Sequence, residues 1–355
     1  MNRTTHLRHL EHLKHLTRLT RLKLGCMALT CLPTPRRVLS GLVLGSAVLW
    51  GNMVHAVYPD RPITLVLSFP AAGASDILAR AVGQKMSDAL GQPVVVENKP
   101  GAGGIIGLSH AAKSAPDGYT IYLAAVSNLA IAAAAYAAQP VSLVKDFVPI
   151  AGIATVPHML VVPASLPVQT VSQLITYLRA SPGKYNFASQ GAGTLSHLES
   201  ELFKNAAGLD LVHVPYKGSS QALPDLISGS STMMFDSIPA SMPHVKSGKL
   251  KVLAVASSKR IGLLPNVPTV DESGLAGFEA NNVFGITAPQ GTPPAVLATL
   301  TKAIQIALSS PELIQRMQSQ GVDLKFKSAN EFSTTIAHEF GTWGKAVETA
   351  RVKLD

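Results

Sequence analysis

The chain has 355 residues, 47% of them hydrophobic and 14% charged, which is enough for two domains with buried cores. The formal net charge of +9 comes mostly from residues 1–56, which hold eight basic residues against one acidic residue, while the remainder holds 22 and 20. This near balance excludes a basic surface for nucleic acid. Cys26 and Cys31 both lie in the N-terminal stretch, so the rest of the chain has no disulfide framework and no thiolate catalyst.

The N-terminal region has the pattern of an export signal. Residues 35–56, PRRVLSGLVLGSAVLWGNMVHA, place two arginines before an apolar run and end on small or aliphatic residues. This order is typical of a secretory signal peptide, and the apolar run is too short for a comfortable membrane span. We therefore expect a signal region over 1–56, cleavage after Ala56 and a mature protein in the periplasm. The Sec and the twin-arginine routes both stay open.

From Tyr58 onward, strand and helix patterns alternate. Short apolar runs rich in β-branched residues predict buried strands at 63–69, 93–98 and 119–125. A second series of strands and helices follows residues 160–167, and residues 282–289 predict a buried connecting strand. Such repeats predict α/β sheets with parallel strands.

The C-terminal tail has the pattern of helices. Ser328 and Glu331 have the spacing of a capping box, which predicts that a helix begins there. The residues that follow at helical spacing predict one buried face: Phe332, Ile336, Phe340, Trp343 and Val347.

Two α/β series joined by short extended crossings predict two lobes with a ligand cleft between them. We place one lobe at residues 57–157 and 284–355, and the other at residues 158–283. Together with the export signal, this organisation favours a periplasmic binding protein.

Three strand-to-helix loops share one composition. SFPAAGASD (68–76), ASQGAGT (188–194) and PYKGSS (215–220) end strands with small residues and begin helices near Ser or Thr. Helix N-termini carry free N–H groups and a partial positive charge, so they bind carboxylates without arginine. We expect the first loop on one side of an anion site and Gly191–Thr194 on the other. The hydroxyls of Ser75, Thr194 and Ser219 either cap these helices or donate to the ligand.

Other polar candidates have structural interpretations beside functional ones. Asp76 is expected to pair with Arg80 across one helical turn. Asp236 either faces the cleft or makes a structural hydrogen bond. The stretch NKPGAGGIIG (98–107) follows a strand, as a dinucleotide fingerprint does, but Ile106 stands where the third glycine belongs. We expect a tight turn there and no cofactor.

Enzyme signatures are missing from the sequence. It contains neither a G-x-S-x-G elbow nor an H-E-x-x-H zinc motif. Ser75 has no histidine near it in sequence, and Ser196 and His197 are adjacent on a helix, where neighbours do not face each other. We expect no catalysis and no metal. The alternative is a secreted hydrolase or transferase that uses Ser75 or Ser196.

Several stretches occur in a characteristic order: YPDRPITLVLSFPAAGASDILAR, VVVENKPGAGGIIG, APDGYTIYLA, HVPYKGSSQALPDLISGS and FGITAPQGTPP. From about Tyr58 to its end, the chain thereby resembles the Bug-type solute receptors of the tripartite tricarboxylate transporter family. The resemblance implies a two-lobe α/β fold of the type II periplasmic-binding class, the Venus flytrap. It also implies capture of a small organic anion, often a carboxylate, and delivery to a membrane permease. We expect a monomer, and a ligand sensor with a signalling partner is a further alternative.

By position, the resemblance also implies which residues bind the ligand. They are Phe69, Ala72, Gly73, Ser75, Asp76, Ser127, Asn128, Gln190, Gly191, Ala192, Thr194 and Asp236. The chain departs from the family at Ala71-Ala72, where Pro-Gly-Gly or a similar stretch is usual. We expect the two methyl groups to narrow the pocket and to leave Gly73 as the position with positive φ.

Overall fold

The computed structural model describes residues 58–354, so the predicted signal region and its cleavage site lie outside the described residues. The strands are β1 (Ile63–Leu67), β2 (Val94–Asn98), β3 (Thr120–Ala125), β4 (Phe147–Pro163), β5 (Asn186–Ser189), β6 (Val212–Pro215), β7 (Met233–Ser237), β8 (Leu250–Val255), β9 (Asn281–Pro289) and β10 (Asp323–Lys327). The helices are α1 (Ala74–Leu90), η1 (Ala102–Gly104), α2 (Ile105–Ala112), α3 (Val126–Ala135), α4 (Val171–Arg179), α5 (Leu195–Ala207), α6 (Ser219–Ser228), α7 (Ile238–Lys246), α8 (Pro294–Leu308), α9 (Pro311–Gln318) and α10 (Ala329–Ala350).

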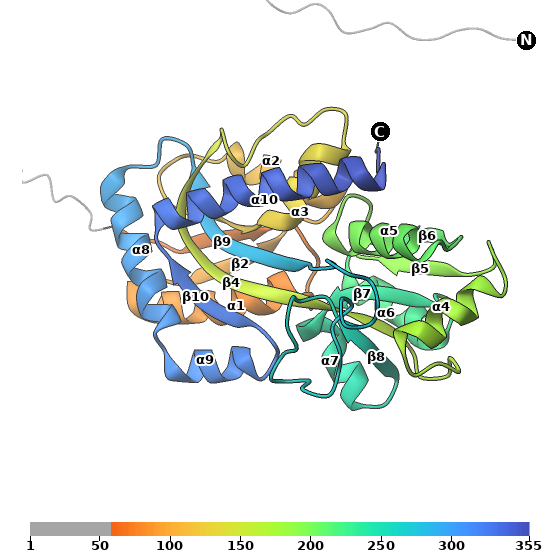
Figure 1. Ribbon diagram of the computed structural model, residues 1–355. Coiled ribbons are helices and arrows are strands. Elements are labelled where there is room, and N and C mark those ends of the chain that lie inside the picture. The colour runs from red at the N-terminus through yellow and green to blue at the C-terminus, as the bar shows by residue number, and fades with distance from the viewer. Residues whose placement is uncertain (1–57, 355) are drawn as a thin grey trace, which may run out of the picture. The chain divides into compact units, whose positions relative to one another are not determined.

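The strands form two groups that share β4. In the first group, β1 pairs in parallel with β2 and β3, β3 pairs antiparallel with β9, and β9 and β10 pair antiparallel with β4. In the second group, β5 pairs in parallel with β6 and β7, while β7 and β8 flank β4 antiparallel. We call the part built on β1–β3, β9 and β10 lobe I and the part built on β5–β8 lobe II (Figure 1).

The 17-residue strand β4 is the main connection between the lobes. Its residues 147–157 pair with β9, and from His158 onward it pairs with β7 and β8. Both predicted crossing points, 157/158 and 283/284, therefore fall inside paired strands and not in open linkers. The lobe boundaries themselves stay a prediction.

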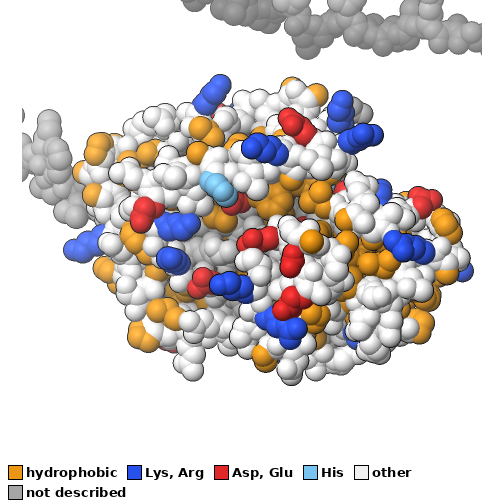
Figure 2. Space-filling view, in the orientation of Figure 1, with side chains coloured by type: hydrophobic (Ala, Val, Ile, Leu, Met, Phe, Trp, Pro, Cys, Tyr) orange, Lys and Arg blue, Asp and Glu red, His pale blue; other side chains and the backbone are white. Residues whose placement is uncertain are grey.

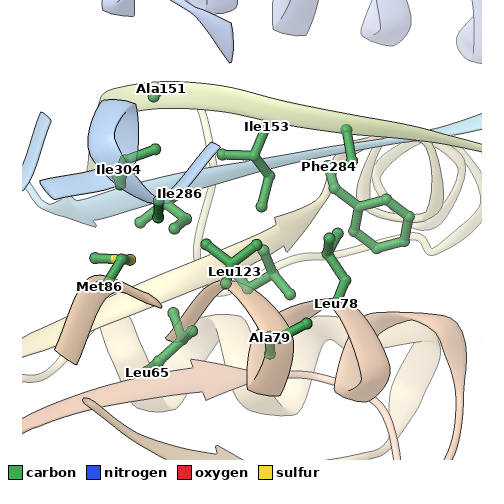
Figure 3. Packing of buried hydrophobic residues seen from close by; sticks show 14 of the residues in the cluster. Leu65, Leu78, Ala79, Met86, Leu123, Ala151, Ile153, Phe284, Ile286 and Ile304 are labelled. Carbon is green, nitrogen blue, oxygen red and sulfur yellow. The ribbon is translucent and has the colours of Figure 1, made fainter. Parts of the chain in front are cut away.

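The two largest clusters of buried apolar side chains are centred on the two lobes. In lobe I, Leu78 and Met86 of α1 pack with Leu123 and Ile286 of the sheet (Figure 3). In lobe II, a separate cluster gathers around Phe187, whose side chain is fully buried. This second cluster also includes Ala130 and Ile131 of α3 and Trp343 of α10, so apolar contacts as well as polar ones join the two lobes.

The predicted apolar face of the last helix, α10, packs against the apolar clusters of both lobes. Ser328 and Glu331 form the expected capping box at the start of α10. Phe332 and Ile336 pack in a cluster with lobe I residues, while Trp343 and Val347 pack with the lobe II cluster. The helix α10 thus runs along both lobes (Figure 1).

The face of the molecule in Figure 2 shows basic and acidic side chains interspersed, in keeping with the near balance of charge in the sequence. Among residues 58–354, no helix combines the length and the apolar character that a membrane crossing requires.

Candidate functional site

A small cavity lies where the two lobes meet. Its lining comes from Phe69, Pro70, Gly73, Ala74, Ser75 and Asn128 in lobe I, from Gln190, Gly218, Ser219 and Ser237 in lobe II, and from Val156, His158, Asn282 and Phe284 in β4 and β9. Its volume of about 20 Å³ corresponds to the space for about one water molecule. The lobes are therefore closed around a polar site.

Two helix N-termini from opposite lobes meet at this cavity. Helix α1 begins after Gly73 and helix α6 after Gly218, and neither has a side chain that caps it. Ser75 lies inside the first turn, so the prediction that it caps α1 is wrong. Ser219 does not cap α6 either, because its hydroxyl donates to Asp236. The first N–H groups of both helices therefore stay available to an anion, with the positive ends of two helix dipoles behind them.

At the N-terminus of α5, side chains of the protein itself already accept from main-chain N–H groups. The hydroxyl oxygen of Thr194 accepts from the His197 N–H at 3.4 Å, which confirms Thr194 as a cap. The amide oxygen of Asn128, from lobe I, accepts from the Leu195 N–H at 2.8 Å. Helix α6, and not the loop Gly191–Thr194, therefore forms the side of the cavity opposite α1.

In the loop before α1, the prediction that Gly73 has positive φ and that Ala71 and Ala72 narrow the pocket is wrong. Ala72 adopts the left-handed conformation, with φ 64°, whereas Gly73 is extended, with φ −85°. The Ala72 N–H donates to Asp76 Oδ2 at 3.1 Å, which holds the turn in this form. Ala71 and Ala72 are exposed and do not line the cavity, so their methyl groups do not narrow it.

Asp76 serves this turn and not the cavity. Its carboxylate accepts from Arg80 Nε and from Asn98 Nδ2, each at 3.0 Å, which confirms the predicted pairing with Arg80. Burial opposes its charge, but the hydrogen bonds from Arg80, Ala72 and Asn98 outweigh burial and lower the pKa of Asp76. Asp76 therefore stabilises the shape of the loop before α1 without lining the cavity.

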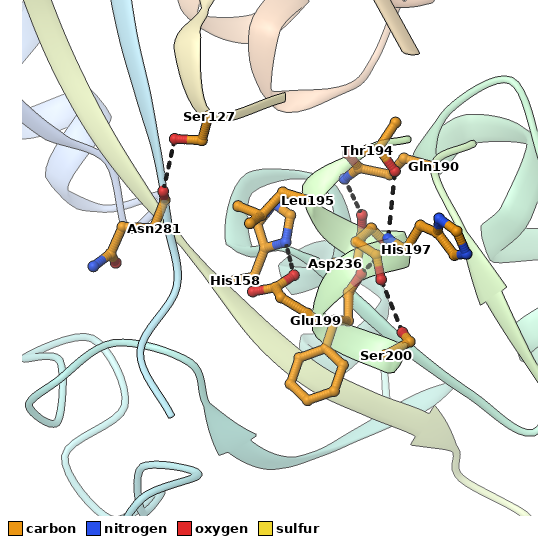
Figure 4. A network of polar contacts seen from close by, with 12 residues as sticks. Ser127, His158, Gln190, Thr194, Leu195, His197, Glu199, Ser200, Asp236 and Asn281 are labelled. Atoms are coloured by element: carbon orange, nitrogen blue, oxygen red, sulfur yellow. Dashed lines mark hydrogen bonds and ion pairs between the residues drawn. The ribbon is translucent and has the colours of Figure 1, made fainter. Parts of the chain in front are cut away.

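Asp236 and Ser127 are likewise directed into the protein. Asp236 Oδ1 accepts from Gln190 Nε2 at 2.7 Å (Figure 4). The same oxygen accepts from Ser219 Oγ at 2.6 Å, and the second carboxylate oxygen accepts from Ser241. Ser127 donates to Glu339 Oε2 at 2.6 Å. Asp236 thus positions two neighbours of the cavity without lining it.

Five of the twelve predicted residues line the cavity: Phe69, Gly73, Ser75, Asn128 and Gln190. The structure places the other seven outside its lining: Ala72, Asp76, Ser127, Gly191, Ala192, Thr194 and Asp236. Contact with a ligand stays a prediction for all twelve.

His158, which lies in β4 at the cavity, is a residue that sequence reasoning missed. His158 Nδ1 lies 2.6 Å from Glu199 Oε2 of α5, and both side chains are fully buried (Figure 4). Burial disfavours the imidazolium, but the charge of Glu199 and the hydrogen bond to it prevail and raise the pKa of His158. A histidine inside an apolar strand and a glutamate on the buried face of a helix were the available signals.

Comparison with known proteins identifies the family. A model described as "Tripartite tricarboxylate transporter family receptor", TctC, matches residues 78–352. The chain belongs to this family. BugT of Bordetella pertussis is 35% identical to it over 315 residues, which cover 88% of this chain and 97% of BugT. The predicted Bug-type resemblance is therefore confirmed.

Solved structures of similar proteins show the same fold. The periplasmic binding protein BugD is 34% identical, with a TM-score of 0.80 over 83% of this chain and 99% of BugD. Rpa4515 of R. palustris, whose structure is described as being with adipate, is 34% identical, with a TM-score of 0.79 and the same coverage. The two-lobe type II periplasmic-binding fold expected from the sequence is confirmed.

Proposed function

We propose that this TctC-family protein is a periplasmic receptor that captures a small organic anion through a carboxylate and delivers it to a tripartite tricarboxylate-type permease. The observation that carries the proposal is the pair of uncapped helix N-termini, α1 and α6, which meet at the cavity from opposite lobes. No lysine or arginine is among the residues that line the cavity. Main-chain N–H groups and hydroxyls would therefore hold the carboxylate. Rpa4515, a relative of this chain, is described with a carboxylic acid.

The small cavity supports a cycle of opening and closing. A space of about 20 Å³ is too small for an organic acid, so the lobes must separate before one enters. The paired strands β4 and β9 would act as the hinge, and the closed form would present both lobes to the permease. In this proposal the receptor acts as a monomer, without a cofactor, and releases its ligand unchanged.

A thermal-shift screen of organic acids tests the proposal. An acid at one hundred times its dissociation constant adds about 2.7 kcal/mol to the free energy of unfolding. We expect such a shift with at least one acid and none with its neutral amide, because the amide lacks the charge that the helix N-termini favour. The ligand recovered after incubation should be chemically unchanged. A panel of mono-, di- and tricarboxylates without any shift would count against the proposal.

A secreted hydrolase is a second candidate, because Ser75 and the buried pair His158–Glu199 reach the same cavity. Ser196 does not support it, since its fully buried hydroxyl donates to the Phe235 carbonyl. Incubation with chromogenic esters separates the two functions. A receptor gives no turnover, whereas turnover that Ser75→Ala abolishes would establish the hydrolase.

The ligand sensor differs from the transport receptor in its partner. Both would use the closed lobes, so the partner has to be supplied in the assay. Uptake of a labelled acid into vesicles that contain the permease, dependent on the added receptor, is the result expected for transport.

A further inference from the structure

Three buried polar atoms at the cavity have no hydrogen-bond partner among the described residues. They are His158 Nε2, Ser237 Oγ and Asn282 Oδ1, and all three residues line the cavity. Buried polar atoms in folded proteins are nearly always paired, so each unpaired one needs an explanation. Three at one small cavity indicate a surface that is completed by a bound molecule.

Strand register explains why these atoms lie together. His158 of β4 is directly opposite Ser237 of β7, and Val156 of β4 is directly opposite Asn282 of β9. Opposite residues of an antiparallel pair share a face, and so do residues two apart on one strand. All four side chains therefore lie on one face of the sheet, at the point where β4 passes from lobe I to lobe II. This face is the floor of the cavity.

Glu199 determines what His158 presents to the cavity. When the His158–Glu199 pair holds a proton between Nδ1 and Oε2, Nε2 carries a hydrogen, whichever of the two residues owns that proton. When the pair loses one proton, Glu199 is a carboxylate and His158 is a neutral imidazole. The single ring hydrogen of His158 then lies on Nδ1 and donates to Glu199, and Nε2 becomes an acceptor. The buried contact of 2.6 Å therefore couples the donor at the cavity to the protonation of the pair.

Building on the proposed receptor function, we propose that His158 is a ligand-binding residue whose Nε2–H donates to an oxygen of the bound acid. The Ser237 hydroxyl lies beside it as a second donor, and Glu199 acts as a positioning residue. The helix N-termini of α1 and α6 hold the carboxylate, and the floor binds a second oxygen-bearing group of the same molecule. Ligands that carry two such groups are therefore favoured over simple monocarboxylates.

The pair gives binding a pH dependence of defined sign. The charged groups that act on His158 are Glu199 from α5 and Asp236 from β7, and both raise its pKa above the ordinary 6.5. Asn282 of β9, Ser237 of β7 and Ser75 of α1 add no charge at the cavity. The donor form exists below the raised pKa, so affinity is full there and falls as the pH rises through it. Binding above that pKa takes up a proton.

Calorimetric titration between pH 6 and 9 with adipate, malate, citrate and glutamate, and with hexanoate as a monocarboxylate, tests the inference. The variant is His158→Gln/Glu199→Gln, which removes both ionisable groups and leaves no buried charge unpaired. We expect about ten- to a hundredfold weaker binding, the effect of losing a hydrogen bond to a charged group, and loss of the pH dependence. The control is His213→Gln, a histidine outside the cavity, which should keep the affinity and the pH profile.

The outcomes separate the inference from the proposed function. If the wild-type protein binds none of the acids, the receptor proposal fails and the inference with it. If the double variant melts cooperatively and binds as the wild type does, His158 is not a ligand contact although the receptor proposal stands. If the double variant does not fold, the wild-type profile decides, and an affinity that is constant or rises between pH 6 and 9 overturns the inference.

Discussion

Pro70 of lobe I and Gly218 of lobe II lie so close that no side chain fits between them. A Cβ atom placed on Gly218 would lie 2.7 Å from Pro70 Cδ, well inside van der Waals contact. Both residues line the cavity, and Gly218 is the N-cap of α6. Closure of the lobes therefore depends on a residue without a side chain at this point.

Gly218→Ala is expected to weaken ligand binding. The added methyl group meets the Pro70 ring in the closed form only, which costs about 1–3 kcal/mol as overpacking does. Calorimetry with the acid found in the thermal screen measures the loss. Gly229→Ala is the matched control, because Gly229 also has positive φ but a Cβ atom placed on it would meet no atom within 4 Å. Equal affinities of Gly218→Ala and wild type would contradict the closure argument.

Asn128→Ala is expected to destabilise the closed form. The change leaves the buried Leu195 N–H without the oxygen of lobe I that accepts from it, at a cost of about 1–3 kcal/mol. Affinity measured by calorimetry should fall accordingly. The control is Thr194→Ala, which removes the other cap of the same helix, α5. Since Thr194 belongs to lobe II, as α5 does, this change should lower the free energy of unfolding by about 1 kcal/mol but reduce affinity less than Asn128→Ala does. The same effect of both variants on affinity would show that the contact between lobes adds nothing.

Ala72→Gly is expected to stabilise the protein by up to about 1 kcal/mol. A non-glycine residue such as Ala72 in the left-handed region costs about 1–2 kcal/mol, and the change to glycine relieves this strain. Because glycine has more conformational freedom in the unfolded chain, part of the gain in stability is offset. Thermal unfolding measures the change, while affinity should stay the same because Ala72 is outside the cavity. Ala71→Gly should instead destabilise, since Ala71 is not among the residues with positive φ. Destabilisation by Ala72→Gly would refute the assignment of strain.

His213 is expected to make the protein sensitive to acid. Burial, followed by the charges of His197 and Lys204, lowers the pKa of His213 from 6.5 to about 3. Because the folded-state pKa is depressed, this contribution to stability is complete above pH 6.5 and is lost as the pH falls toward 3. The melting temperature of the wild type should therefore fall between pH 6.5 and 4, and that of His213→Gln should fall less. Parallel curves would show that His213 carries none of the effect.

Local sequence patterns predicted several features correctly. The alternation of apolar runs and helical patterns predicted the strands near 63–69 and 119–125, and the capping box at Ser328 predicted the start of α10. These features depend on residues a few positions apart, so the sequence alone contains their cause. The prediction of Ser75 as a cap failed because the last extended residue is Gly73, two positions earlier.

The order of motifs in the sequence determined the family and with it the two-lobe fold, and it favoured a site at helix N-termini. Only the tertiary structure decided which N-termini are open and what the floor of the cavity presents. The oxygen that closes α5 belongs to Asn128, 67 residues before Leu195, and the carboxylate that holds His158 lies 41 residues after it. An N–H group at a helix terminus or on a histidine can bind a ligand only if no side chain from a distant part of the chain already accepts from it. That condition depends on contacts between elements, which periodicity and spacing do not describe.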